Sequence, residues 1–210
     1  MIKILIADDH PVVRKGLKEI IKENSDMVVA AEAGHGQEVL EKALKKEFDV
    51  VVLDISMPGR SGLEVLKQLK RERPELSVLI LSIHPEEHYA VRVLKAGASG
   101  YLTKESVPDE LIKAIRKIST GRKYISSTLA EKLAFDLESG GEKPAHERLS
   151  DREYEVMCLI ASGKTLKEIA EKLCLSAKTI STYRSRILEK MKMKNNAELT
   201  HYAIKNNLVD

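Results

Sequence analysis

The stretch from Val50 to Gly59 constrains the fold of this chain more than any other. Three valines and a leucine run directly into the carboxylate of Asp54, and a Pro-Gly pair follows shortly after. A continuous apolar run is typical of a strand that is buried on both faces, as in a parallel sheet. Such strands end at the carboxyl edge of the sheet, where open α/β folds bind ligands. Asp54 is therefore predicted at that edge, although a carboxylate there can also simply cap the next turn.

Four other short apolar runs alternate with amphipathic segments in the first 120 residues. They cover 3–7, 27–31, 77–81 and 99–102, and a segment with helical periodicity follows each run. This alternation predicts an α/β fold with a doubly wound, five-stranded parallel sheet. Right-handed crossovers would bring the carboxyl ends of all five strands to one edge. The pattern leaves the strand order open.

Residues suited to phosphate chemistry follow these predicted strands. Asp8 and Asp9 follow the first strand, Ser82 ends the fourth, and Lys104 follows the fifth. Oxygen ligands at the mouth of a cleft suit Mg²⁺, and a carboxylate oxygen there can attack phosphorus to form a mixed anhydride. Charge on the phosphoryl oxygens then calls for a fixed cation, which Lys104 can supply, and for a hydrogen bond, which Ser82 can donate.

Composition excludes a membrane-spanning protein. No apolar run reaches the roughly 18 residues that a spanning helix needs, and the N-terminus turns acidic too early for a signal peptide. We therefore expect a cytoplasmic protein with no membrane partner. The two cysteines, Cys158 and Cys174, lie among apolar residues and are expected to be buried free thiols.

The excess positive charge lies in the last third of the chain. Residues 149–210 hold 11 Lys and Arg against 8 Asp and Glu, whereas residues 1–120 and 121–148 are each balanced. This asymmetry suggests a nucleic-acid partner for the basic end. A helix is predicted over 129–137, and the breaker-rich stretch 139–144 is expected to link two domains.

The last sixty or so residues are predicted to be entirely helical. Capping boxes at Ser150–Glu153 and Thr165–Glu168 open two helices, and Ser176 caps a long basic helix. This spacing predicts a helix-turn-helix, in which small polar residues of the long helix enter the major groove and cations reach phosphates. A solvated basic helix is the alternative. The predicted DNA-contacting residues are Lys178, Thr179, Ser181, Thr182, Tyr183, Arg184, Ser185, Arg186 and Lys190.

Residues 1 to about 120 resemble the receiver domain of two-component response regulators. The motifs that carry the resemblance are Asp8-Asp9, Val51-Val52-Leu53-Asp54 with Met57-Pro58-Gly59 and Gly62, Leu81-Ser82, and Gly97-Ala98-Ser99-Gly100-Tyr101-Leu102-Thr103-Lys104. The resemblance implies the strand order 2-1-3-4-5. It also implies that Asp54 accepts a phosphoryl group from a sensor histidine kinase. The chain departs from the family at Glu105, where many receivers carry Pro.

The same resemblance implies a Mg²⁺ site and a conformational switch. Asp9 and Asp54 would bind the ion with the Ser56 backbone carbonyl, and Asp8 would act through water. Ser82 and Tyr101 match the switch pair, in which the hydroxyl moves to the phosphoryl group and the ring rotates inward.

Residues 146–210 are similar to the four-helix LuxR-type DNA-binding domain. The matching motifs are Leu149-Ser150-x-Arg152-Glu153, Lys167-Glu168-Ile169-Ala170, Leu175-Ser176-x-Lys178-Thr179-Ile180 and Arg186-Ile187-Leu188-x-Lys190-Met191. Together the two resemblances indicate the NarL/FixJ class of transcriptional regulators. The expected parts are a receiver domain at 1–120, a linker helix and flexible linker at 121–145, and the DNA-binding domain at 146–210.

The class implies a phosphorylation-activated regulator that binds operator DNA as a homodimer, helped by a last helix near 197–205. It implies no enzyme activity beyond the chain's own phosphotransfer and dephosphorylation. Two other functions fit parts of the pattern. A Mg²⁺-dependent phosphohydrolase is one, but haloacid-dehalogenase-type phosphatases carry Asp-x-Asp on the first strand, unlike the adjacent pair Asp8-Asp9. A phosphorylation-gated adaptor, in which the last helices bind protein, is the other; salt-dependent binding of duplex DNA would argue against it.

Overall fold

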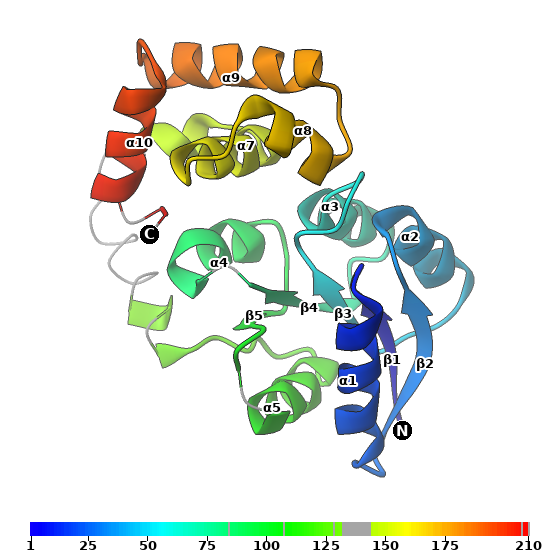
Figure 1. Ribbon diagram of the computed structural model, residues 1–210. Coiled ribbons are helices and arrows are strands. Elements are labelled where there is room, and N and C mark those ends of the chain that lie inside the picture. The colour runs from blue at the N-terminus through cyan, green and yellow to red at the C-terminus, as the bar shows by residue number, and fades with distance from the viewer. Residues whose placement is uncertain (84, 107, 128, 132–143, 207, 210) are drawn as a thin grey trace. The chain divides into compact units, whose positions relative to one another are not determined.

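The computed structural model describes residues 1–83, 85–106, 108–127, 129–131, 144–206 and 208–209. The chain divides into two units, residues 1–133 and 134–210. The first is α/β and the second is helical (Figure 1). The predicted helix over 129–137 and the predicted linker at 139–144 lie largely outside the described residues. None of the helices in these ranges is long and apolar enough to cross a membrane.

One five-stranded parallel sheet forms the centre of the first unit, in the order β2-β1-β3-β4-β5. The predicted fold class and the strand order implied by the receiver resemblance are confirmed. The strands are β1 (Ile2–Ala7), β2 (Met27–Ala33), β3 (Val50–Asp54), β4 (Ser77–Ser82) and β5 (Gly100–Thr103). Their register pairs Ala7 with Leu53 and Ser82 with Thr103. The chain segments that follow β1, β3, β4 and β5 therefore leave the sheet at one edge.

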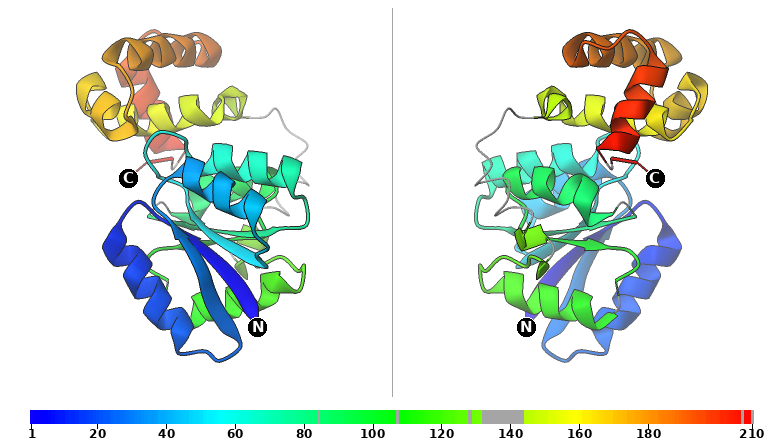
Figure 2. Two further views of the ribbon diagram at one scale, coloured as in Figure 1. Left: turned by 90° about the vertical axis from the view of Figure 1, so that its right-hand side faces the viewer. Right: turned by 90° about the vertical axis from the view of Figure 1, so that its left-hand side faces the viewer.

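Helices cover both faces of this sheet. On one face lie α1 (Pro11–Lys22) and α5 (Pro108–Ser119), and on the other lie α2 (Gly36–Lys45), α3 (Gly62–Glu72) and α4 (Glu86–Lys95), as Figures 1 and 2 show. Strand side chains alternate between the two faces. The core under α1 and α5 accordingly takes every second residue of three strands: Ile4, Ile6, Val50, Val52, Leu79 and Leu81.

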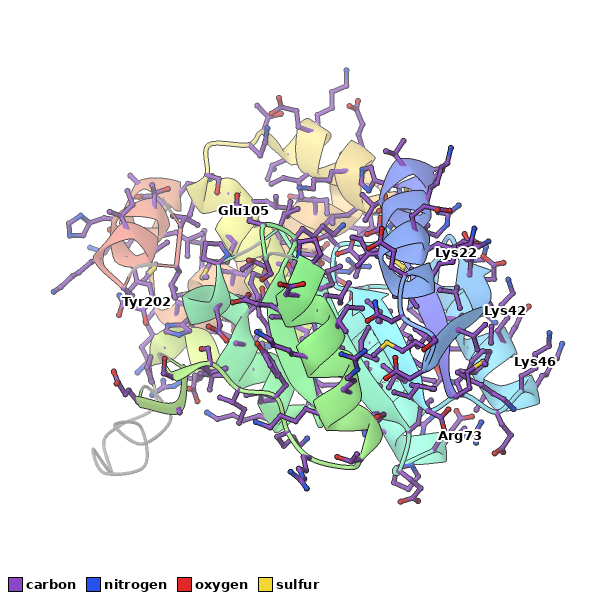
Figure 3. The ribbon with its side chains drawn as sticks, turned by 90° about the horizontal axis from the view of Figure 1, so that it is seen from below. Lys22, Lys42, Lys46, Arg73, Glu105 and Tyr202 are labelled. Carbon is purple, nitrogen blue, oxygen red and sulfur yellow. The ribbon has the colours of Figure 1, made fainter. Side chains whose placement is uncertain are left out.

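Close contacts at the helix ends fix α3 against the sheet and against α2. A Cβ at Gly62 would lie 2.2 Å from the Asp54 carbonyl oxygen, so only glycine lets α3 begin this close to the end of β3. At the other end of α3, Arg73 Nη1 donates hydrogen bonds of 2.9 Å to the carbonyl oxygens of Ala43 and Lys46, which close α2 (Figure 3). These contacts satisfy carbonyl groups that a helix end leaves free.

Where the structure describes it, the second unit contains a short 3₁₀ helix, η1 (Ala145–Arg148), and four α-helices. These are α7 (Asp151–Ala161), α8 (Leu166–Leu173), α9 (Ala177–Met191) and α10 (Asn196–Lys205). Both predicted capping boxes are present, with Ser150 and Thr165 as N-caps. The predicted four-helix domain is confirmed.

Four predictions about single side chains were wrong. The spacing of apolar residues in the sequence predicts that Val12 and Leu44 lie on the inner faces of the first two helices, but they are 83% and 43% exposed. The same spacing predicts that Leu188 is buried in the long basic helix, whereas it is half-buried in α9. Cys158 is a buried free thiol as expected, whereas Cys174 is exposed. Cys174 ends α8 with a φ of 53°, a left-handed conformation that turns its side chain out of the apolar run around it.

Candidate functional site

An acidic pocket lies at the carboxyl edge of the sheet, where Asp8, Asp54 and Lys104 meet. Asp8 and Asp54 are almost fully buried. The Lys104 ammonium nitrogen lies 2.6 Å from Asp8 Oδ2 and 2.8 Å from Asp54 Oδ2. The backbone N–H of Lys104 also donates to the carbonyl oxygen of Ser82 at 2.7 Å. The structure thus brings these four predicted residues together from the ends of four strands.

Burial and ion pairing act in opposite directions on the two charged groups at the centre. Burial raises the pKa of Asp54, and this outweighs the lowering caused by Lys104 and by the Ser56 N–H, which donates to Asp54 Oδ1 at 3.1 Å. Burial lowers the pKa of Lys104, but hydrogen bonds to Asp54 and Asp8 outweigh it and raise the pKa above its ordinary value. Lys104 is therefore a fixed cation beside a carboxylate that is incompletely solvated.

The donor set of this pocket fits a divalent cation. Asp8, Asp9, His10 and Asp54 each offer one ligand atom, and these atoms lie within 4.8 Å of one another. Apart from ion pairs with Lys104 and His10, the buried oxygens Asp8 Oδ2 and Asp9 Oδ1 have no hydrogen-bond donor. Carboxylate oxygens left without donors are costly to bury, and a hard cation such as Mg²⁺ would satisfy them.

The two residues of the predicted switch, Ser82 and Tyr101, lie beside this pocket. Both are fully buried, and their side chains share a hydrogen bond. Burial of Tyr101 raises the pKa of its phenol well above the ordinary value, although the bond to Ser82 opposes this shift. The Tyr101 ring is therefore neutral and turned inward.

Glu105 follows Lys104 through a trans peptide bond and lies in the loop before α5 (Figure 3).

Two residues at the pocket were assigned no role by sequence reasoning. The imidazole of His10 places Nδ1 2.8 Å from Asp9 Oδ1 and 3.3 Å from Asp8 Oδ1. Arg14 Nη1 donates to the backbone carbonyl of Asp8 at 2.7 Å. The position of His10 directly after two aspartates was a usable signal. Nothing in the spacing of Arg14 indicated that it would turn back toward Asp8.

The predicted DNA-contacting residues lie on α9, which crosses α7 and α8 (Figure 1). Lys178, Ser181, Thr182, Ser185 and Arg186 are exposed, whereas Thr179, Tyr183 and Arg184 are half-buried. Hydroxyl groups on this face already bond within the helix, since Thr182 Oγ1 donates to the Lys178 carbonyl at 3.0 Å. The exposed face of α9 thus carries small polar side chains and basic side chains.

Two of the predicted cations are held by other helices of the same unit. Arg184 Nε donates to Asn196 Oδ1 of α10 at 2.6 Å. Lys190 Nζ lies 2.6 Å from Glu153 Oε2, a buried carboxylate of α7. These contacts connect α9 to its neighbours, so both residues have a structural role whether or not they reach DNA.

Two family models match the chain. Residues 4–116 match the response regulator receiver domain, and residues 147–203 match the bacterial regulatory proteins of the luxR family. This chain belongs to the response regulators. It has a LuxR-type DNA-binding domain and is of the NarL/FixJ class, a phosphoacceptor transcription regulator rather than a catalytic enzyme. The phosphohydrolase and adaptor alternatives are thereby set aside, and a receiver domain implies a kinase partner.

Characterised response regulators resemble this one along its whole length. It is 36% identical over 209 residues to the response regulator UvrY of Escherichia coli, covering 99% of this chain and 96% of UvrY. It is 37% identical over 210 residues to the response regulator GacA of Pseudomonas protegens, covering 100% and 99%. RcsB of Salmonella enterica serovar Typhimurium, bound to the rprA promoter with the phosphomimetic BeF₃⁻, has a similar structure. That match has a TM-score of 0.65 and 28% identity, and it covers 96% of this chain and 97% of the RcsB chain.

Proposed function

We propose that Asp54 accepts a phosphoryl group from a sensor histidine kinase and that this modification controls binding to operator DNA. The observation that carries the proposal is the contact of Lys104 Nζ with Asp54 Oδ2, at 2.8 Å, at the carboxyl edge of the sheet. An Asp54 oxygen would attack the phosphorus atom, and the leaving imidazole of the kinase histidine would depart in line. Lys104 would offset the charge on the phosphoryl oxygens, and Ser82 would donate a hydrogen bond to one of them.

The cation of this pocket is proposed to be Mg²⁺. Asp9, Asp54 and the backbone carbonyl of Ser56 would hold it, and Asp8 would contact it through water. When bound, the ion neutralises charge on the phosphoryl oxygens. Asp8 also holds Lys104 in place through their 2.6 Å contact. This pairing keeps the ammonium beside Asp54 before a phosphoryl group arrives.

The switch is proposed to run through Ser82 and Tyr101. Bonding of the Ser82 hydroxyl to a phosphoryl oxygen would compete with its present bond to Tyr101. Both side chains are fully buried, so a change at one must be accommodated by the other. Phosphorylation would thereby shift a pre-existing equilibrium toward the conformation that binds DNA.

We further propose that residues 146–210 bind duplex DNA as a homodimer and that the protein acts in the cytoplasm. The proposed parts are the receiver at 1–120, the linker helix and flexible linker at 121–145, and the DNA-binding domain. Base and phosphate contacts would come from Lys178, Thr179, Ser181, Thr182, Tyr183, Arg184, Ser185, Arg186 and Lys190. Support comes from the exposed basic face of α9 and from a similar structure that contains two RcsB dimers bound to two parallel DNAs. Two linked DNA-binding domains bind two half-sites more tightly than a single domain binds one, because the first contact raises the effective concentration of the second domain.

The phosphoacceptor is tested by labelling with acetyl phosphate in the presence of Mg²⁺. We expect the native chain to gain the mass of one phosphoryl group and Asp54→Asn to gain none. Asp49→Asn is the matched control, because Asp49 caps the opposite end of the sheet through the Lys3 backbone N–H. Full labelling of Asp54→Asn would contradict the assignment.

The DNA-binding face is tested by measuring affinity for a mixed-sequence duplex over a range of salt concentrations. Lys178→Ala is expected to weaken binding and to reduce the slope of log affinity against log salt by about 1. Lys164→Ala, an exposed lysine after α7, is the control and should leave the slope unchanged. Equal slopes for the native chain and Lys178→Ala would count against α9 as the recognition helix.

A further inference from the structure

We propose that the imidazole of His10 is a ligand of the divalent cation at the acidic pocket. This site would then prefer first-row transition ions such as Mn²⁺ over Mg²⁺ more strongly than a site made of carboxylates alone. The inference rests on the metal site of the proposed function and adds a residue to it. Its first support is position, because His10 Nδ1 belongs to the same cluster of ligand atoms as Asp8, Asp9 and Asp54, all within 4.8 Å.

The distances from His10 match neighbouring positions around one ion. In an octahedral site with bonds of about 2.1 Å, adjacent ligand atoms lie about 3.0 Å apart and opposite atoms about 4.2 Å apart. His10 Nδ1 lies 2.8 Å from Asp9 Oδ1, close to the separation of adjacent ligands, and 3.3 Å from Asp8 Oδ1, whose carboxylate would reach the ion through water. The shorter contact is a histidine–carboxylate pair, and a cation that displaced the ring proton would be held by the same two atoms.

A second histidine in the same local setting behaves differently. His10 and His35 are the N-cap residues of α1 and α2. His35 turns its ring onto its own helix, where Nδ1 accepts a hydrogen bond from the Glu38 N–H at 3.3 Å. His10 makes no such cap bond and directs its ring toward the carboxylates instead. The orientation of His10 is therefore not explained by helix capping.

The backbone fixes His10 to the pocket while leaving its ring accessible. The His10 N–H donates to Asp8 Oδ1 at 2.8 Å, so the turn from Asp8 to His10 is closed on itself. Pro11 begins α1 and has no N–H, which removes one of the donors that a cap would satisfy. The His10 side chain is 67% exposed. An ion entering from solvent can meet the ring together with Asp9.

An imidazole changes which ion the site selects. Mg²⁺ is a hard cation that prefers oxygen ligands and retains its waters, whereas first-row transition ions accept nitrogen ligands more readily, Mn²⁺ least strongly among them. A site that adds one imidazole to its oxygen ligands should therefore gain affinity for Mn²⁺ through His10 and gain little for Mg²⁺. Selection between the two ions would then depend on a residue outside the carboxylate set.

The test uses the full chain with Mn²⁺ as the probe and the variant His10→Asn. Asparagine is a favoured N-cap, so α1 should be retained, and its side-chain N–H can still orient Asp9. Mn²⁺ affinity is measured from the electron paramagnetic resonance signal of the free ion, and Mg²⁺ affinity is measured by competition with Mn²⁺. Nitrogen ligation is detected as electron spin-echo modulation from ¹⁴N. His35→Asn is the matched control, and Asp9→Asn tests the site itself.

We expect imidazole ¹⁴N modulation in the native chain and in His35→Asn, and none in His10→Asn. Mn²⁺ affinity should fall about tenfold in His10→Asn, with a much smaller change for Mg²⁺. Absent imidazole modulation in the native chain, or an equal fall for both ions, would overturn the inference and leave His10 as a residue that orients Asp9. In either of those cases Asp9→Asn would still lose the ion, so the proposed function would stand. Unchanged Mn²⁺ binding in Asp9→Asn would instead overturn both.

Discussion

Lys104 holds the acidic pocket together before any phosphoryl group or metal is bound. Its ammonium contacts Asp8 and Asp54 at 2.6 and 2.8 Å, and both carboxylates are almost fully buried. Charges taken out of water need partners, and a single cation shared by two carboxylates leaves one negative charge in excess. That excess would be neutralised by the proposed divalent ion, which would also let an anionic phosphoryl group approach Asp54.

Arg14 is expected to act on this pocket as a positioning residue. Arg14→Ala should weaken Mg²⁺ binding about tenfold, because its Nη1 holds the Asp8 carbonyl at 2.7 Å and thereby the turn that carries Asp9. Calorimetric titration with Mg²⁺ measures the effect. Lys18→Ala is the control, since Lys18 shares the Glu32 carboxylate with Arg14 but makes no bond to Asp8. Native affinity in Arg14→Ala would show that the turn holds its shape alone.

The pocket was predictable from sequence only as far as strand ends determine it. Asp54, Ser82 and Lys104 end or follow apolar runs, and parallel strands must bring such positions to one edge. His10 and Arg14 reach the same place through side-chain directions set by a turn and the first turns of α1. Periodicity does not encode those directions, so the two residues became visible only in the structure.

Helix ends were predicted more accurately than helix faces. The capping boxes are local, because Ser150 and Glu153 bond each other's backbone within four residues. The exposure of Val12 and Leu44 depends on where neighbouring elements stop covering the helix. Cys174 differs from prediction for a related reason, since its left-handed backbone turns one residue away from an otherwise apolar run.

Lys190 is expected to stabilise the helical unit in addition to its proposed contact with DNA. Lys190→Met should lower the free energy of unfolding by about 1–2 kcal/mol, because it leaves the buried Glu153 carboxylate without its cation. The loss is limited to this range because Lys190 is half-exposed, so that solvent screens the ion pair in the native chain. Urea denaturation measures the loss. Lys178→Met, which removes an exposed charge from the same helix, should change stability little. Equal stability of the two variants would argue that the ion pair has no net effect.

The same pair predicts how stability depends on pH. Burial raises the pKa of Glu153, but Lys190 and Ser150 outweigh it and hold the pKa below its ordinary value of 4.5. Glu153 therefore contributes stability above pH 4.5, and this contribution is lost as the pH falls through the lowered folded-state pKa. Glu153→Gln should be less stable than the native chain at pH 7, with the difference shrinking in acid. A difference that stays constant down to acid pH would contradict this, and Glu171→Gln serves as the exposed control.

At the scale of the molecule, two units with different chemistry share one chain. The alternation of strands and helices predicted the α/β unit, but periodicity left the strand order open. The order came from the resemblance to receivers and is confirmed by the sheet. Charge and capping signals predicted the helical unit. Coupling between the units follows from neither pattern, because it would depend on how the proposed phosphorylation changes their association.

A phosphoryl group on Asp54 is proposed to control where this regulator binds DNA. Genome-wide mapping of bound fragments tests it most directly, using the native chain and Asp54→Asn, each with and without acetyl phosphate and Mg²⁺. We expect the phosphodonor to raise occupancy at a defined set of sites for the native chain and to leave the map of Asp54→Asn unchanged. Equal maps under all four conditions, or the same increase for Asp54→Asn, would contradict it.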